Sequence, residues 1–165
     1  MNKTFKLVLF IIGGLALLLF GLYKLSTLFA PGSYPFVETY ELNHSEANVI
    51  QAINKFKTDN PDFIVPKVKI NNTGTFDLPG ERKDSLDHWY HVYFYFKKEN
   101  LIIYTWTRPV TKNKTTFAFV SINKGLSIGN WQDINHDLSS SENDRLIQIF
   151  ETEILKPIQT NFGQQ

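Results

Sequence analysis

The most apolar part of the chain is its beginning, where Leu7 to Tyr23 contains no charged or strongly polar residue. Lys3 and Lys6 precede this run and Lys24 follows it. A helix of roughly 17 residues is about 25 Å long, at the short end of what crosses a bilayer. Apolar residues beyond the run lengthen it (Leu25, Leu28, Phe29). The pattern predicts a transmembrane helix over residues 7–29.

The charges around this helix predict its orientation. The lysines before it and the amino terminus favour a cytoplasmic amino end by the positive-inside rule. The alternative is a cleaved secretory signal ending at Ala30, although Pro31 at the next position disfavours cleavage. We therefore expect a signal anchor over residues 1–30, a single pass through the inner (cytoplasmic) membrane, and a periplasmic domain over residues 31–165.

The first half of this domain has one strand-like and one helix-like segment. Polar and apolar positions alternate from Phe36 to Leu42, which predicts a short strand. Apolar residues recur at helical spacing over residues 44–58, which predicts an amphipathic helix. Asn43 and Glu46 have the spacing of a capping box, so Asn43 is the expected N-cap. Residues 63–70 contain a proline and are expected to form an edge strand or a covering loop.

The strongest pattern of the chain is a series of three β-forming runs. His88 to Phe96 is dense in aromatic residues, and Leu101–Thr107 and Thr115–Ile122 follow after short polar turns. Short connections predict an antiparallel meander. The first run is apolar on both faces, so we expect it in the middle of the sheet.

A final amphipathic helix is expected after Ser139, because Ser139 and Glu142 again have capping-box spacing. The expected order of elements is β-α-β-β-β-α. The predicted fold is therefore an α+β domain with one antiparallel sheet of three to four strands and two amphipathic helices.

Length and charge narrow the functional classes. About 135 residues after the anchor suit one domain with its own core. The net charge is +1, which gives no overall field to attract nucleic acid. The chain contains no cysteine, which excludes a disulfide and a lipid-bearing thiol. We expect neither a nucleic-acid partner nor a cofactor.

One motif suggests a serine hydrolase. Residues 125–129 match G-x-S-x-G with Ser127 at its centre, and Asp133 and His136 follow in the order of a hydrolase triad. The expected context is wrong, because a nucleophile elbow needs a parallel sheet and a helix directly after the serine. A small cell-envelope hydrolase using Ser127 remains an alternative function.

A metal site is not expected. His88 and His91 are three residues apart, so on a strand their side chains point to opposite faces. Asp87 and His91 share a face, but four residues of extended chain separate them by about 13 Å. The histidines are expected to be polar-tipped rings of a half-buried strand.

Aromatic side chains are the best candidates for binding. Trp89 and Tyr93 share a face of the first run, and Tyr104 and Trp106 share a face of the second. Stacked across two strands, they predict a platform for a protein, a sugar or an apolar peptide. Packing inside the core is the alternative explanation. The candidate binding residues are Trp89, Tyr93, Tyr104, Trp106 and Trp131, with a basic rim of Arg108, Lys112 and Lys114.

The function that follows is partner binding, since aromatic and arginine side chains concentrate binding energy. We expect a membrane-anchored domain that binds another envelope or secreted protein. Such a domain would be an accessory subunit of an envelope complex or an immunity protein that neutralises a toxin. The alternatives are the hydrolase and a sugar- or peptide-binding module.

Overall fold

A computed structural model of the chain describes residues 2–28, 34–70, 74–84 and 87–164. The chain divides into two compact units, residues 1–35 and residues 36–165. The expected domain boundary after residue 30 and the candidate cleavage point at Ala30 lie outside the described residues.

The first unit is built on one helix, α1 (Lys3–Leu28). Crossing a bilayer requires a helix that is both long enough and apolar enough to span the hydrocarbon core. Within the described part of the chain, no helix meets both requirements. The predicted transmembrane helix over residues 7–29 is therefore wrong. The signal anchor and the single pass through the inner membrane are wrong with it, and the expected position of residues 31–165 outside the cytoplasm loses the helix on which it was based.

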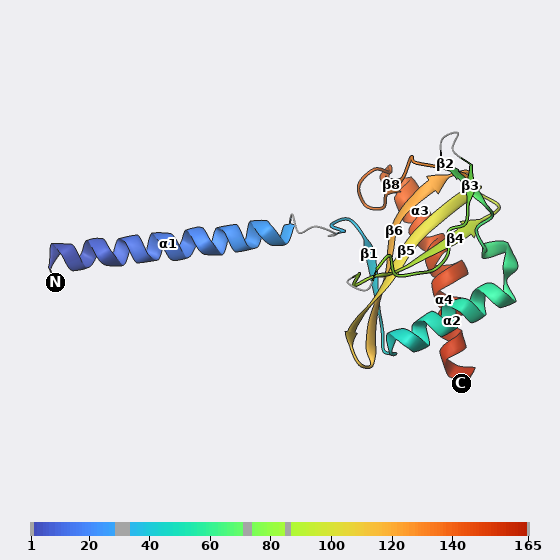
Figure 1. The fold of residues 1–165 in the computed structure, drawn as a ribbon, viewed down its shortest axis with the longest axis horizontal. Coiled ribbons are helices and arrows are strands. Elements are labelled where there is room, and N and C mark those ends of the chain that lie inside the picture. Colours follow the sequence, from blue (N-terminus) through green and yellow to red (C-terminus); the bar gives the residue numbers. More distant parts are fainter. Residues whose placement is uncertain (1, 29–33, 71–73, 85–86, 165) are drawn as a thin grey trace. The chain divides into compact units, whose positions relative to one another are not determined.

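The second unit contains the described strands and the remaining helices (Figure 1). They are β1 (Glu38–Leu42), α2 (Glu46–Asp59), β2 (Val68–Ile70), β3 (Thr75–Phe76), β4 (Tyr90–Phe96), β5 (Leu101–Thr111), β6 (Lys114–Lys124), β7 (Ser127–Ile128), β8 (Gln132–Asp133), α3 (Ser140–Phe150) and α4 (Lys156–Thr160). A π-helical stretch, Glu151–Leu155, joins α3 to α4. Short 3-10 turns lie at Pro61–Phe63 and Asn161–Gln164.

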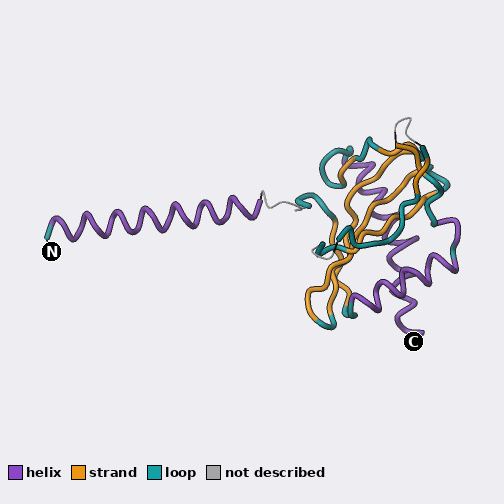
Figure 2. The backbone as a smooth tube through the Cα atoms, viewed as in Figure 1, coloured by secondary structure: helices purple, strands orange, loops and turns teal. Residues whose placement is uncertain are grey.

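The strands form two sheets, so the unit is an α+β structure (Figure 2). The large sheet has the antiparallel order β1-β6-β5-β4, and β8 also pairs with β6. The small sheet has the order β3-β2-β7, in which β2 and β7 are parallel. Strands of two or three residues show too little alternation to be predicted, so the sequence-based estimate of three to four strands was too low.

The position of β4 differs from the prediction. β4 lies at the border of the large sheet, not in its middle. β6 takes the central position because β1 pairs with it over residues 38–42, and this pairing of segments far apart in sequence gave no local signal.

Helix starts are set by serine side chains. Ser139 Oγ accepts a hydrogen bond from the Glu142 N–H at 3.4 Å, as the capping-box spacing predicts for α3. For α2 the predicted cap was Asn43, but Ser45 has the extended backbone of an N-cap, and its Oγ accepts from the Asn48 N–H at 3.3 Å. Two side chains suited to capping lie two residues apart here, and the nearer one begins the helix.

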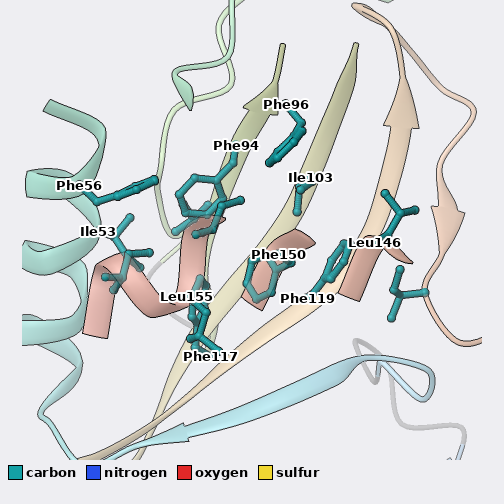
Figure 3. Close-up of a cluster of buried hydrophobic side chains, with 14 of the residues drawn as sticks. Ile53, Phe56, Phe94, Phe96, Ile103, Phe117, Phe119, Leu146, Phe150 and Leu155 are labelled. Carbon is teal, nitrogen blue, oxygen red and sulfur yellow. The ribbon is translucent and has the colours of Figure 1, made fainter. Parts of the chain in front are cut away.

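The hydrophobic core lies between the helices and one face of the large sheet (Figure 3). Phe150 of α3 is fully buried at its centre. Its ring centroid lies 5.0 Å from that of Phe119 and 5.5 Å from that of Phe117, both on β6. Full burial of one such side chain contributes about 1.5–3 kcal/mol. The helices therefore stabilise the sheet from one side, which leaves the other face for different chemistry.

Candidate functional site

The face of the large sheet opposite the helices carries most of the predicted binding residues. Side chains alternate between the two faces of a strand. Phe94 of β4 belongs to the core beneath the helices, so His91 and Tyr93 point to the other face. The same alternation on β5 places Tyr104 and Trp106 there.

Strand register brings these rings together. Tyr93 is paired with Tyr104 across β4 and β5, and their rings stack with centroids 5.1 Å apart and planes 20° apart. Trp131, from the segment between β7 and β8, packs against both tyrosines at 6.1 and 6.0 Å. Trp89, just before β4, packs edge-on against Trp106 at 6.2 Å. We call these five residues the aromatic cluster.

The members of the aromatic cluster differ in exposure. Trp106 is 4% exposed and is the buried member of the cluster. Trp89, Tyr93, Tyr104 and Trp131 are half-buried. A half-buried Trp or Tyr offers a rigid apolar surface to a partner and keeps its polar tip near water. Four of the five predicted anchors therefore present part of their surface on one face of the sheet.

A polar chain lies within the aromatic cluster. His91 Nε2 lies 2.8 Å from Asp87 Oδ2, and His91 Nδ1 lies 2.5 Å from the Tyr104 hydroxyl oxygen. The His91 side chain is 3% exposed and that of Asp87 is 10% exposed. Ionised Asp87 can only accept, so His91 donates to it from Nε2, and in the tautomer with its proton on Nε2 the ring accepts from the Tyr104 hydroxyl at Nδ1. The histidine thus ties one ring of the cluster to a buried carboxylate.

Asp87 is held in its charged form. Burial raises the pKa of its carboxyl, but hydrogen bonds from the Trp89 N–H, the His91 ring and the Lys83 N–H outweigh burial, and the pKa falls to about 2. The two backbone bonds measure 3.0 and 3.1 Å. A carboxylate with three donors remains ionised at neutral pH.

This arrangement corrects the sequence-based geometry. Asp87 and His91 were expected about 13 Å apart, along one continuous strand from His88. The strand begins only at Tyr90, and Asp87 lies in a turn that brings its carboxylate back to the histidine ring. The polar chain was missed because the alternation of residues 88–96 gives no sign of where the strand starts.

Hydrogen bonds fix the segment before β4. Glu81 and His91 exchange backbone hydrogen bonds of 3.0 and 2.8 Å. Arg82 forms an ion pair with Glu46 at the start of α2 and donates to the Asp87 carbonyl at 3.2 Å. Glu46 also accepts from Thr107 Oγ1 at 3.1 Å. These bonds set the positions from which Asp87 and Trp89 reach the aromatic cluster.

The predicted basic rim is only partly at the cluster. Arg108 is exposed and lies two residues after Trp106, on the same face of β5. Lys112 is exposed in the turn between β5 and β6, roughly 13 Å of extended chain beyond Arg108. Lys114 is paired with Glu41 of β1 at 2.5 Å. Of the three predicted rim residues, Arg108 is therefore the one that adjoins the cluster along β5.

The G-x-S-x-G motif does not form a nucleophile elbow. Ser127 is exposed in the two-residue strand β7, and the next residues turn through Gly129, whose φ of 135° is not helical. His136 bonds Asp137 at 2.8 Å and stacks on Phe36. Among the described residues, no hydrogen bond joins Ser127 Oγ to His136. The serine, the histidine and a helix are not assembled as the chemistry requires.

The described residues also contain no group of three His, Asp or Glu side chains placed to hold a metal ion. Comparison with known protein families and with curated proteins finds no match to this chain. The candidate function therefore depends on the aromatic cluster, its polar chain and Arg108.

Proposed function

We propose that residues 36–165 act as a binding domain that holds a partner protein against the aromatic cluster. The observation that carries the proposal is the gathering of Trp89, Tyr93, Tyr104 and Trp131 on one sheet face, each half-buried. Trp and Tyr are enriched among residues that dominate protein-protein binding energy.

Two further features support a preorganised surface. The polar chain Asp87–His91–Tyr104 holds a tyrosine of the cluster from beneath. A side chain that is already fixed loses less conformational entropy when a partner arrives. Arg108 at the edge of the cluster adds a cation that selects a partner with an acidic rim.

A sugar- or peptide-binding role would use the same rings. The hydrolase role lacks a supporting geometry, as described for Ser127. Protein binding is favoured over a sugar because the cluster spans three separate segments and continues to Arg108, a broader surface than one ring platform.

The proposal is tested by photo-cross-linking in cells. Benzoylphenylalanine is placed at Trp131 in the full chain, and at Phe63 in a matched control. Phe63 is also a half-buried aromatic residue, but it packs among the helix-side residues, 5.0 Å from Phe56 between ring centroids. Adducts are identified by mass spectrometry.

One dominant protein adduct at position 131, absent at position 63 and reduced by Arg108→Glu, supports the proposal. Identical adducts at both positions contradict it. Absence of any protein adduct at 131, with retention of the chain on a carbohydrate column, would assign the cluster to a sugar.

A further inference from the structure

The two borders of the large sheet expose their backbones differently. At the β4 border, the backbone N–H and C=O of His91 are both hydrogen-bonded to the backbone of Glu81. Lys57 Nζ donates to the Tyr93 carbonyl at 2.7 Å, and burial lowers the pKa of this lysine to about 8. Near the end of β4, the rings of Phe63 and Phe96 meet at 5.7 Å. Covering a border strand in this way prevents pairing with other chains.

Alternation of backbone groups shows which residues of β1 face outward. In an antiparallel ladder, the N–H and C=O of one residue point to the same side, and neighbouring residues alternate. The backbone N–H and C=O of His91 bond to Glu81, on the side away from β5. The backbone groups of its cross-strand partner Trp106 therefore point to β6. Trp106 pairs with Ala118, so the backbone groups of Ala118 point back to β5. The backbone groups of the neighbouring residues Phe117 and Phe119 then point to β1.

It follows that some backbone groups of β1 point away from the ladder. Phe117 pairs with Tyr40, so the backbone N–H and C=O of Tyr40 bond to β6. The backbone groups of Thr39 and Glu41 therefore point away from β6, and both residues are exposed. Among residues 34–70, 74–84 and 87–164, no hydrogen bond reaches the backbone of Thr39 or Glu41 from outside the ladder. The outer side of β1, which we call the β1 border, thus offers two donors and two acceptors in a row.

The charge around the β1 border is acidic. Glu41 lies in the strand and is paired with Lys114. Glu38 accepts from the Asn135 side chain at 3.2 Å, and Glu151 accepts from the Tyr40 hydroxyl at 3.2 Å. Burial, together with the charges of Glu151 and then Glu38, raises the pKa of Tyr40. Two carboxylates of β1, Glu38 and Glu41, and Glu151 of the neighbouring π-helical stretch therefore lie near this border, and Glu41 has Lys114 as a cationic partner.

We propose that the β1 border is a docking site for an extended, basic segment of a partner protein, which adds to the sheet as a further strand. Strand addition obtains affinity from main-chain hydrogen bonds to an open border and specificity from alternate side chains. A second copy of β1 is a poor occupant, because antiparallel pairing would bring its carboxylates against these. The site uses none of the residues of the aromatic cluster, so it stands or fails separately.

The probe is a synthetic strand, acetyl-Lys-Val-Lys-Val-Lys-Val-amide, added to the full chain labelled with ¹⁵N. We expect the amide signals of Thr39 and Glu41 to move to lower field and their hydrogen exchange to slow, because both N–H groups gain an acceptor. The same peptide with Glu in place of Lys serves as the charge control and is expected to leave both amides unchanged.

Three variants locate the contact. Thr39→Pro removes one outward N–H without removing a ladder bond, and it should abolish the response at Glu41. Thr39→Val keeps the N–H and should retain the response. Glu41→Lys should weaken binding about tenfold, since the strand loses its charge complementarity. Thr39→Val and Glu41→Lys keep the test decisive if Thr39→Pro fails to fold.

The proposal is overturned if Thr39 and Glu41 do not respond to the basic peptide, or if the acidic peptide produces the same response. Protection of both amides that depends on protein concentration, without peptide, would assign the border to a second copy and overturn the partner. A response confined to Tyr93 and Trp131 would place the peptide on the aromatic cluster instead.

Discussion

The two faces of the large sheet are made from different side chains. The helix side is filled by Phe, Ile and Leu, with Phe150 fully buried against rings of β6. The opposite face carries Trp and Tyr around a buried histidine and carboxylate. Apolar packing stabilises without demanding a fixed direction, whereas the hydrogen bond between the Tyr104 hydroxyl and His91 Nδ1 fixes the Tyr104 ring in place. The comparison indicates that one face supplies stability and the other supplies a positioned surface.

The largest expected effect is on the helix side. Phe150→Ala should lower the free energy of unfolding by about 3–5 kcal/mol, because it removes a buried ring and leaves a cavity. Urea denaturation followed by circular dichroism measures it. A loss below about 1 kcal/mol would mean that the helix side is not the main source of stability.

The next effect concerns the polar chain. Asp87→Asn should cost about 1–3 kcal/mol, because buried His91 loses its charged acceptor. Tyr104→Phe, which removes only the hydroxyl, should cost about 1 kcal/mol. The same denaturation assay compares both with the unchanged chain. Equal costs for the two variants would show that the carboxylate has no special part in holding the histidine.

Acid should remove the contribution of Asp87. Its folded pKa, about 2, lies below the ordinary 3.8, so the folded state prefers the ionised group. The resulting stability is fully present above about pH 4 and is lost as pH falls toward 2. We expect the difference in unfolding free energy between the unchanged chain and Asp87→Asn to shrink over this window. If the difference in unfolding free energy stays constant between pH 4 and 2, the lowered pKa of Asp87 is contradicted.

The smallest expected effect on stability is at the rim. Arg108→Glu should change the unfolding free energy by less than about 0.5 kcal/mol, since Arg108 is exposed. Partner binding should nevertheless weaken, mainly through slower association at low salt. Surface plasmon resonance at two ionic strengths separates these effects. Unchanged association at low salt would remove Arg108 from the interface.

Sequence patterns were sufficient where one local signal decided the structure. Runs of β-forming residues separated by short turns indicate β4, β5 and β6, and in the structure the four-residue turn between β4 and β5 places Tyr93 opposite Tyr104. Ser139 caps α3 as its spacing predicts. These features depend on neighbours a few residues apart, which a single sequence records.

Other features depend on contacts between distant segments. The border position of β4 follows from the pairing of β1 with β6. Asp87 reaches His91 because the segment before β4 is held by Arg82 and Glu46, which are 36 residues apart. The membrane prediction failed for another reason: it was made from the apolar run and its flanking lysines, and no described helix fulfils the requirements for crossing a bilayer.

The most direct test of the central claim compares binding with stability for two half-buried aromatic residues, one on each side of the sheet. Affinity for the partner identified by cross-linking is measured by calorimetry for Trp131→Ala and Phe63→Ala. The account predicts that Trp131→Ala weakens binding by tenfold or more, about 1.4 kcal/mol, while Phe63→Ala leaves it unchanged even where it costs more stability. Equal losses of affinity in both variants would show that binding follows stability alone, and would contradict a binding surface at the aromatic cluster.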